Sequence, residues 1–210
     1  MTRFVILLGG TLVVTARLRR QIAGARVIAA DGGMRHAETL GLTPELWVGD
    51  FDSTPADLLA RHGQVPRDRH SPDKDKTDGE IAADAAIARG AREIVMVGGL
   101  GGQADHTLGH FALTLRLAQD GLATFLTSGD EEAHPLLPGE TRLDLDDGTR
   151  LSVIALASIA KLTLEGVRWP LTDREVPLGS TLTLSNVAHG PVVIRFASGY
   201  GMALAYPPTS

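Results

Sequence analysis

The chain has 210 residues, a formal net charge of −5 and no cysteine. This length is enough to bury a substantial core, in one large domain or two modest ones. The absence of cysteine excludes disulfides, thiolate metal ligands and a cysteine nucleophile, and it suits a reducing compartment. The 20 lysines and arginines are scattered, whereas a general nucleic-acid-binding protein carries a basic patch. We therefore expect a small-molecule partner and no nucleic acid.

The first apolar segment, Phe4 to Leu8, ends at Gly9-Gly10. With Arg3 before it and apolar residues after it, this segment imitates a signal peptide, but the glycine pair interrupts it and no convincing cleavage site follows. It is also too short to span a bilayer. We predict a first buried strand ending in a glycine turn, in a cytoplasmic protein without a membrane partner.

The pattern up to residue 129 predicts an α/β domain. Apolar runs predict strands at Phe4–Leu8, Arg26–Ala30, Leu46–Val48, Glu93–Val97 and Ala123–Thr127. Their continuous apolar character is typical of parallel strands that are buried on both faces. The stretches Ile81–Arg89 and Thr107–Gln119 read as helices, each followed by a glycine. This alternation indicates a mostly parallel sheet with helices packed on it.

Residues 130–210 change to short strand patterns separated by turn residues. The predicted strands are Thr141–Leu145, Arg150–Ala157, Leu162–Leu164, Ser180–Leu184, Val192–Phe196 and Met202–Tyr206. Several short strands at this spacing favour a small antiparallel β-sandwich. We place the boundary between the two domains near residues 128–132.

Acidic and glycine residues follow three of the predicted parallel strands. They form the segments Asp31-Gly32-Gly33, Asp50-Phe51-Asp52 and Gly98 to His106. Because ligands bind outside the carboxyl ends of the strands in an open parallel sheet, these segments predict a site at one edge. A further segment, Ser71 to Glu80, adds Asp73, Asp75 and Asp78.

Each acidic segment also has a local explanation. Asp52 or Ser53 could cap a helix, and Thr77 with Glu80 fits a capping box. Capping uses one acid per helix, however, and the stretches "DFD" and "DKDKTD" alone supply five. A divalent cation relieves the repulsion between crowded carboxylates, and oxygen ligands without thiols favour Mg²⁺, which usually shares its ligands with substrate phosphates. The acids therefore predict a phosphate ligand, and the glycines allow it close to the backbone.

Common alternatives for a phosphate or metal site are absent. The sequence has no P-loop motif and no dinucleotide-binding glycine motif in the required context. His106 and His110 lie four residues apart and could share a helical face, but they lack the acid of H-E-x-x-H. No nucleophile elbow of a serine hydrolase occurs.

Four segments, "ADGG", "VGDFDS", "DKDKTDGE" and "GGLGGQADHTLGH", resemble in order and spacing the thiamine pyrophosphokinase family. The likeness continues in "EGVRWPLTDREVPLGSTLTLSN", which resembles the segment by which the β-rich domain of that family contributes to thiamine binding across a dimer. The resemblance implies transfer of a pyrophosphoryl group from ATP to thiamine with Mg²⁺, giving thiamine diphosphate and AMP. It also implies a homodimer of chains that each combine an α/β nucleotide domain with a β-sandwich.

The resemblance also implies roles for individual residues. The metal ligands and catalytic carboxylates would be Asp50, Asp52 and Asp78, with Asp75 as a further ligand. Nucleotide contacts are expected from Asp31, Gly32, Gly33, Asp75, Lys76, Thr77 and Gln103. Thiamine contacts are expected from Asp105, from Trp169 as an aromatic platform, and from Ser185 and Asn186. A tryptophan can stack on a flat cationic ring, although Trp169 could instead simply fill the sandwich core or a dimer contact.

One position departs from the family pattern. Gln103 stands where the glycine loop of the family commonly has arginine, which replaces a fixed positive fork by a neutral amide. If that arginine meets phosphate, another cation must take its place. The candidates are Lys74, Lys76, Arg17 and Arg35.

Two other functions compete with this interpretation. Residues 50–54 also match the D-x-D-x-[TV] pattern of haloacid-dehalogenase-like phosphatases, in which the first Asp is a nucleophile, although that motif normally follows the first strand. A nucleotide or thiamine sensor that performs no chemistry is the second alternative.

Overall fold

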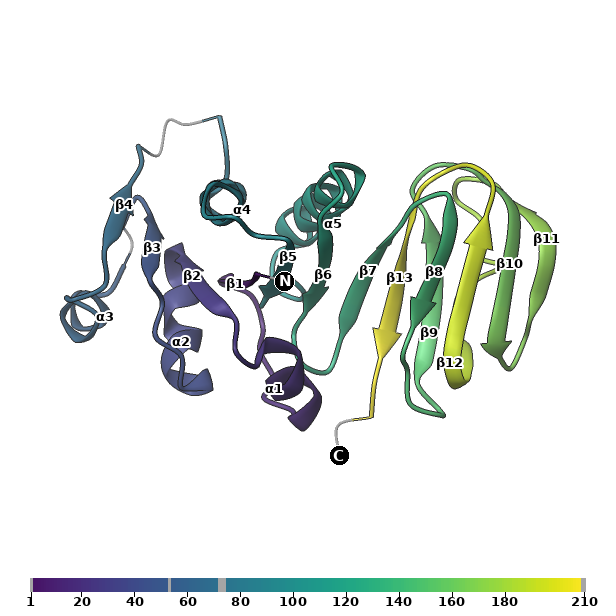
Figure 1. Cartoon of the computed structure of the whole chain (residues 1–210), viewed down its shortest axis with the longest axis horizontal. Helices are drawn as coiled ribbons and strands as arrows, with labels where there is room; N and C mark the ends of the chain where they lie inside the picture. The colour runs from purple at the N-terminus through teal and green to yellow at the C-terminus, as the bar shows by residue number, and fades with distance from the viewer. Residues whose placement is uncertain (1, 53, 72–74, 209–210) are drawn as a thin grey trace.

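The computed structural model describes residues 2–52, 54–71 and 75–208. Figure 1 shows an α/β part formed by the N-terminal half and a β-rich part formed by the C-terminal half, which lie side by side. Asp73 and Lys74, which the sequence placed near the site, lie outside the described residues. No described helix is long and apolar enough to cross a membrane.

The α/β part contains a six-stranded parallel sheet in the order β4-β3-β2-β1-β5-β6. The strands are β1 (Arg3–Leu7), β2 (Arg26–Ala30), β3 (Leu46–Gly49), β4 (Arg67–Arg69), β5 (Glu93–Val97) and β6 (Ala123–Thr127). The chain first adds strands on one side of β1 and then, from β5 on, on the other side. The order therefore reverses between β1 and β5, where the carboxyl ends of the strands leave a crevice.

Helices cover both faces of this sheet. They are α1 (Ala16–Ile22), α2 (Arg35–Leu40), α3 (Ala56–Arg61), α4 (Asp78–Ala88) and α5 (Ala104–Gln119), with a 3-10 turn at Asp31–Met34. One core cluster packs α4 and α5 against side chains such as Phe4 and Ile6. Another packs α1, α2 and α3 against Val5, Leu7 and Trp47. Successive β1 residues thus face opposite helical layers, which explains the continuous apolar runs.

The C-terminal part is built from antiparallel strands. They are β7 (Glu132–Leu136), β8 (Gly139–Leu143), β9 (Arg150–Ala155), β10 (Ile159–Val167), β11 (Leu171–Val176), β12 (Asn186–Phe196) and β13 (Gly201–Tyr206). The long strand β12 pairs with β9 near its start and with β8 and β10 further on. It thereby joins two sheets around one apolar core, to which all seven strands contribute. The expected fold class is confirmed.

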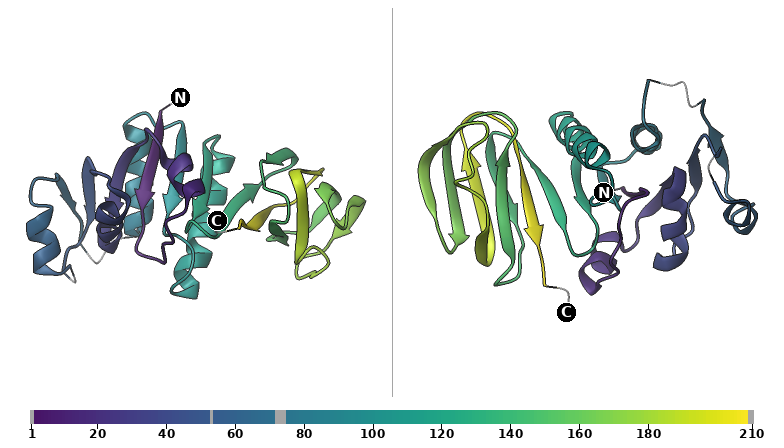
Figure 2. Two further views of the ribbon diagram at one scale, coloured as in Figure 1. Left: turned by 90° about the horizontal axis from the view of Figure 1, so that it is seen from below. Right: turned by 180° about the vertical axis from the view of Figure 1, so that it is seen from behind.

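Strand pairing continues from one part to the other. β6 pairs antiparallel with β7, and β7 pairs with β13. The two views in Figure 2 show the β-rich part beside the last strands of the α/β part. The chain therefore passes between the two parts through paired strands.

The strand predicted at Ser180–Leu184 is wrong, because this segment forms turns. Leu184 N donates to Thr181 O and Leu182 N donates to the Ser180 hydroxyl, so local hydrogen bonds replace a ladder. The side chains of Leu182 and Leu184, which suggested a buried face, are exposed.

The sequence reading did not identify strands β4, β7 and β11. β4 and most of β11 are exposed and polar, and β7 carries a buried glutamate and a proline. None of the three has the apolar pattern by which a strand is recognised.

Candidate functional site

A wide cavity lies at the point where the strand order reverses. Its volume is about 660 Å³. The loop after β1 contributes Leu8, Gly9 and Gly10, and the loop after β5 contributes Gly98 and the segment Gly101 to Gln103. A ligand is expected in this place in an open α/β sheet. The glycines present backbone groups to the cavity, which favours a phosphate.

Four carboxylates line this cavity from three separate segments. Asp31 follows β2, Asp50 follows β3, and Asp75 and Asp78 stand at the start of α4. Of the expected nucleotide contacts, Gly32, Lys76, Thr77 and Gln103 also line it. The structure thus brings together most of the residues predicted for the nucleotide and the metal.

Asp52 and Gly33 are placed differently from the other predicted residues. Asp52 does not line the cavity, and its carboxylate accepts a hydrogen bond from Arg69 at 2.9 Å. Gly33 is buried, and a Cβ on it would lie 2.1 Å from the carbonyl oxygen of Leu7. Gly33 therefore permits the turn after β2 to pack against β1, which is a structural role.

Trp47 supports two strained turns at the edge of the cavity. Asp31 and Phe51 have positive φ angles of 44° and 63°, which non-glycine residues rarely adopt. The indole N–H of the fully buried Trp47 donates to the backbone oxygen of Asp31 at 2.9 Å. Its ring meets that of Phe51 edge to face, with the centroids 5.0 Å apart. One side chain in β3 thus holds the turns that carry Asp31 and Asp50.

The start of α4 combines a cap with charged residues. The Thr77 hydroxyl accepts from Glu80 N at 3.3 Å, which confirms one half of the predicted capping box. The Glu80 carboxylate instead meets Lys76 and Arg116, at 3.6 and 3.0 Å. Lys76 also donates to Asp84 at 2.6 Å. This hydrogen bond is the main cause that raises the pKa of Lys76.

Arg17 and Arg35 were the other described candidates to replace the arginine that the family commonly has in place of Gln103. Both are held by protein groups. Arg17 binds the carboxylate of Glu132, away from the cavity. Arg35 donates to the backbone oxygens of Gly9 and Gly10. His36, next to it, hydrogen-bonds Gly10 O at 3.0 Å, and burial lowers its pKa. Arg35 and His36 therefore fix the loop after β1, which the sequence reading did not anticipate.

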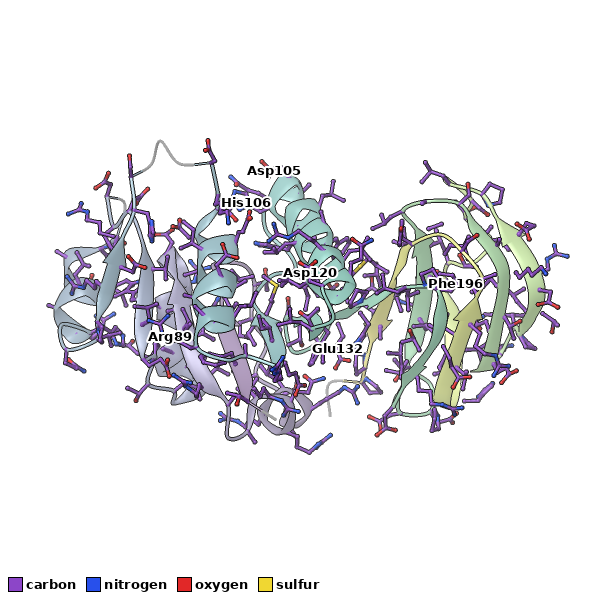
Figure 3. The ribbon with its side chains drawn as sticks, turned by 45° about the horizontal axis from the view of Figure 1, so that its top comes forward. Arg89, Asp105, His106, Asp120, Glu132 and Phe196 are labelled. Atoms are coloured by element: carbon purple, nitrogen blue, oxygen red, sulfur yellow. The ribbon has the colours of Figure 1, made fainter. Side chains whose placement is uncertain are left out.

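A smaller cavity of about 340 Å³ adjoins the first between α4 and α5. It is lined by Thr77, Glu80, Asp105, His106, Gly109, His110 and Leu113. Asp105 and His106 lie at one end of α5 in Figure 3. The His106 and His110 rings are 6.2 Å apart, so the two histidines do share a helical face. His110, which is not among the predicted site residues, also lines the larger cavity.

The residues expected to bind thiamine through the β-rich part line neither cavity. Trp169 is 53% exposed, whereas Asn186 is buried. The backbone N–H of Trp169 donates to the Asn186 side-chain oxygen at 3.1 Å, and the Asn186 side-chain amide donates to the backbone oxygen of Trp169 at 2.8 Å. Ser185, before Asn186, has a positive φ of 60°. Asn186 thus holds the backbone that carries an exposed indole ring.

The donor groups at the larger cavity fit a magnesium ion that is shared with a ligand. No three described His, Asp or Glu side chains are close enough to hold a metal by themselves. Mg²⁺ is commonly held by one or two carboxylates together with waters and substrate phosphates. Carboxylates beside a glycine-lined space match this requirement.

Comparison with known proteins relates both halves of the chain to one family. The family model for the thiamin pyrophosphokinase catalytic domain matches residues 22–126, and the model for the vitamin B1 binding domain matches residues 140–200. A thiamine pyrophosphokinase of Bacillus subtilis is 31% identical over 177 residues, which cover 82% of this chain and 83% of that protein.

Solved structures with the same fold include two bacterial thiamine pyrophosphokinases. The Bacillus subtilis structure has a TM-score of 0.87 and 26% identity, covering 98% of this chain and 99% of the other. The Geobacillus thermodenitrificans structure has a TM-score of 0.83 and 28% identity, covering 100% and 99%. The similarity therefore extends over nearly the whole chain.

Proposed function

The chain belongs to the thiamin pyrophosphokinase family, and on this premise we propose that it transfers the pyrophosphoryl group of ATP to the hydroxyl group of thiamine. The products are thiamine diphosphate and AMP. The observation that carries this proposal is the larger cavity, where four carboxylates and two glycine-rich loops meet at the reversal of the sheet.

The proposed nucleotide site occupies this cavity. The glycine loops after β1 and β5 place backbone groups near the phosphates, and Lys76 adds a positive charge. Asp50 and Asp78 would hold Mg²⁺, with Asp75 as a further ligand. Asp52 would become a further metal ligand if its carboxylate released the hydrogen bond from Arg69 and bound the ion instead. When bound, the ion neutralises negative charge on the phosphates, and the chain contributes by positioning the reactants.

Thiamine is proposed to reach the nucleotide from the side of the smaller cavity, where Asp105 lies. Trp169, Ser185 and Asn186 would complete its site from the β-rich part of a second copy. The separation of these residues from both cavities within one chain supports this homodimer, as does the exposure of Trp169. Residues 1–129 would then bind nucleotide and metal, and residues 130–210 would bind thiamine and form the dimer. A cytoplasmic location, which fits the absence of cysteine, completes the proposal.

A product assay tests this function against its two alternatives. Incubation with ATP, Mg²⁺ and thiamine is expected to yield AMP and thiamine diphosphate in equal amounts. A phosphatase would instead release inorganic phosphate and form a phosphoryl-aspartate at Asp50. A sensor would bind the ligands and leave both unchanged. Either of these two results would overturn the proposed function.

A further inference from the structure

The two cavities meet at three residues. Thr77, His106 and His110 line both of them. If the proposed function holds, the phosphates of ATP lie in the larger cavity and thiamine approaches from the smaller one. The attacking hydroxyl then reaches the β-phosphorus where the cavities meet. A group that accepts the hydroxyl proton must therefore stand at this boundary.

The orientation of the His110 ring is fixed by the loop after β5. Its Nδ1 lies 2.9 Å from the backbone oxygen of Gly99. Because a carbonyl oxygen only accepts hydrogen bonds, Nδ1 must carry the hydrogen. In a neutral imidazole the other nitrogen, Nε2, then has a free lone pair. The hydrogen bond to Gly99 thus selects the tautomer in which Nε2 is the base.

The Nε2 atom is turned toward the start of α4. A Cβ on Gly79 would lie 3.8 Å from it, so the glycine leaves space for a ligand on this side of the ring. Within residues 2–52, 54–71 and 75–208, Nε2 has no hydrogen-bond partner. Burial lowers the pKa of His110 and outweighs the hydrogen bond to Gly99, which acts in the opposite direction. The lowered pKa favours the neutral ring near neutral pH.

The other two boundary residues are less suited to accept a proton. The hydroxyl oxygen of Thr77 already accepts from Glu80 N as the cap of α4, and an alcohol is a weak base. His106 is exposed, and in the described part of the chain no hydrogen bond fixes which of its ring nitrogens carries the hydrogen. His110 alone combines a fixed tautomer with a place at the boundary.

We propose that Nε2 of His110 accepts the proton of the thiamine hydroxyl during pyrophosphoryl transfer. The O–H bond breaks as the oxygen forms a bond to the β-phosphorus. The bond from the β-phosphorus to the oxygen that bridges it to the α-phosphorus breaks, and its electron pair leaves with AMP. The resulting imidazolium returns its proton to water after the products depart, so no further reactant is needed.

The His110→Asn substitution separates the two functions of the ring. The asparagine amide stands near the position of Nδ1 and can still donate to Gly99, but nothing replaces Nε2. We expect kcat to fall about 100-fold or more, the lower range for loss of a general base, while KM for ATP and thiamine changes less than about threefold. His189→Asn is the matched control, because this exposed histidine pairs with Asp147 in the β-rich part. It is expected to keep the wild-type kcat.

A measurement on the resting protein tests the tautomer without activity. Nitrogen-15 NMR of histidine-labelled protein is expected to show Nε2 of His110 without a proton at neutral pH, with the signal assigned by its loss in His110→Asn or by through-bond correlations. A protonated Nε2, or a His110→Asn enzyme with kcat within about threefold of wild type, would overturn the proposal. If the wild type forms no thiamine diphosphate, the proposed function itself fails, and the inference fails with it.

Discussion

Trp47 shows how a single buried residue can support the candidate site. The backbone strain at Asp31 and Phe51 costs free energy, and such strain persists only where surrounding contacts hold it. Trp47 supplies a hydrogen bond to one turn and a ring contact to the other. The two turns carry Asp31 and Asp50, so the side chain that positions these carboxylates is itself not a ligand.

The Trp47→Phe substitution is expected to destabilise the protein by about 1–3 kcal/mol. Phenylalanine keeps an aromatic ring but leaves the backbone oxygen of Asp31 without its donor. Urea unfolding measures the change, and binding of an ATP analogue should weaken in parallel because the turns are less well fixed. Trp169→Phe is the control for stability, since Trp169 is exposed and should shift the free energy of unfolding by less than about 0.5 kcal/mol. Equal stability of Trp47→Phe and wild type would refute the supporting role.

Several residues of the candidate site could be predicted from sequence because acids and glycines follow apolar strands. The carboxyl ends of parallel strands share an edge, so Asp31 and Asp50 were placed together correctly. The contribution of His110 could not be predicted this way. Its role depends on a hydrogen bond to Gly99 in another loop, which no local pattern reveals.

At the scale of elements, Glu132 connects α1 with β7. Its buried carboxylate accepts hydrogen bonds from Arg17 and Gln21 of α1, and it contacts His134 on its own strand. Arg17 also donates to Asp144 O, beyond β8. Figure 3 shows Glu132 at the junction between the two parts of the molecule. This network ties the helix after the first glycine loop to the β-rich part.

The network makes stability depend on pH through Glu132. Burial by itself raises the pKa of this carboxyl, but hydrogen bonds from His134 and Arg17 outweigh it and lower the pKa to about 2. A depressed pKa stabilises the fold above the pKa of the unfolded chain, near 4.5, and this contribution is lost as pH falls toward 2. The full contribution is about 3 kcal/mol.

The Glu132→Gln substitution should remove this pH dependence. We expect a loss of about 3–5 kcal/mol at neutral pH, because Arg17 keeps its charge without a partner. The free energy of unfolding, measured in urea from about pH 6 down to about pH 3, should fall less steeply in the variant than in wild type. Glu140→Gln is the control, since its carboxylate is paired on the surface with Arg142 and Arg195. Parallel pH profiles for wild type and Glu132→Gln would contradict this account.

The sequence predicted the buried strands well and the polar ones poorly. Arg26–Ala30, Glu93–Val97 and Ala123–Thr127 have the predicted limits, because strands inside a parallel sheet are mostly apolar. Edge strands such as β11 are exposed and polar, so only their partners reveal them. The two apolar side chains of residues 180–184, Leu182 and Leu184, misled the prediction because both face outward.

At the scale of the whole molecule, the proposal requires residues from two chains in each active site. Asp50→Asn should abolish turnover, and Trp169→Ala should raise KM for thiamine. In a homodimer each site would take Asp50 from one chain and Trp169 from the other. A hybrid of the two variants would therefore contain one intact site and one doubly altered site.

Mixing the two variants after reversible unfolding tests this arrangement. Random pairing makes half of the dimers hybrids, so the mixture should recover about a quarter of the wild-type activity at low thiamine concentration. Each variant refolded alone is the control. Activity no greater than the average of the two separate samples would show that each chain builds its site without a partner.

In the proposed site, carboxylates from separate segments of the α/β part hold one divalent ion together with a nucleotide. A crystal grown with Mn²⁺ and a non-hydrolysable ATP analogue tests it most directly, through the anomalous signal of the metal. We expect a peak in the larger cavity, about 2.1 Å from carboxylate oxygens of Asp50 and Asp78, for a metal that is also bonded to phosphate oxygens. A nucleotide bound elsewhere, or a metal that touches neither carboxylate, would contradict it.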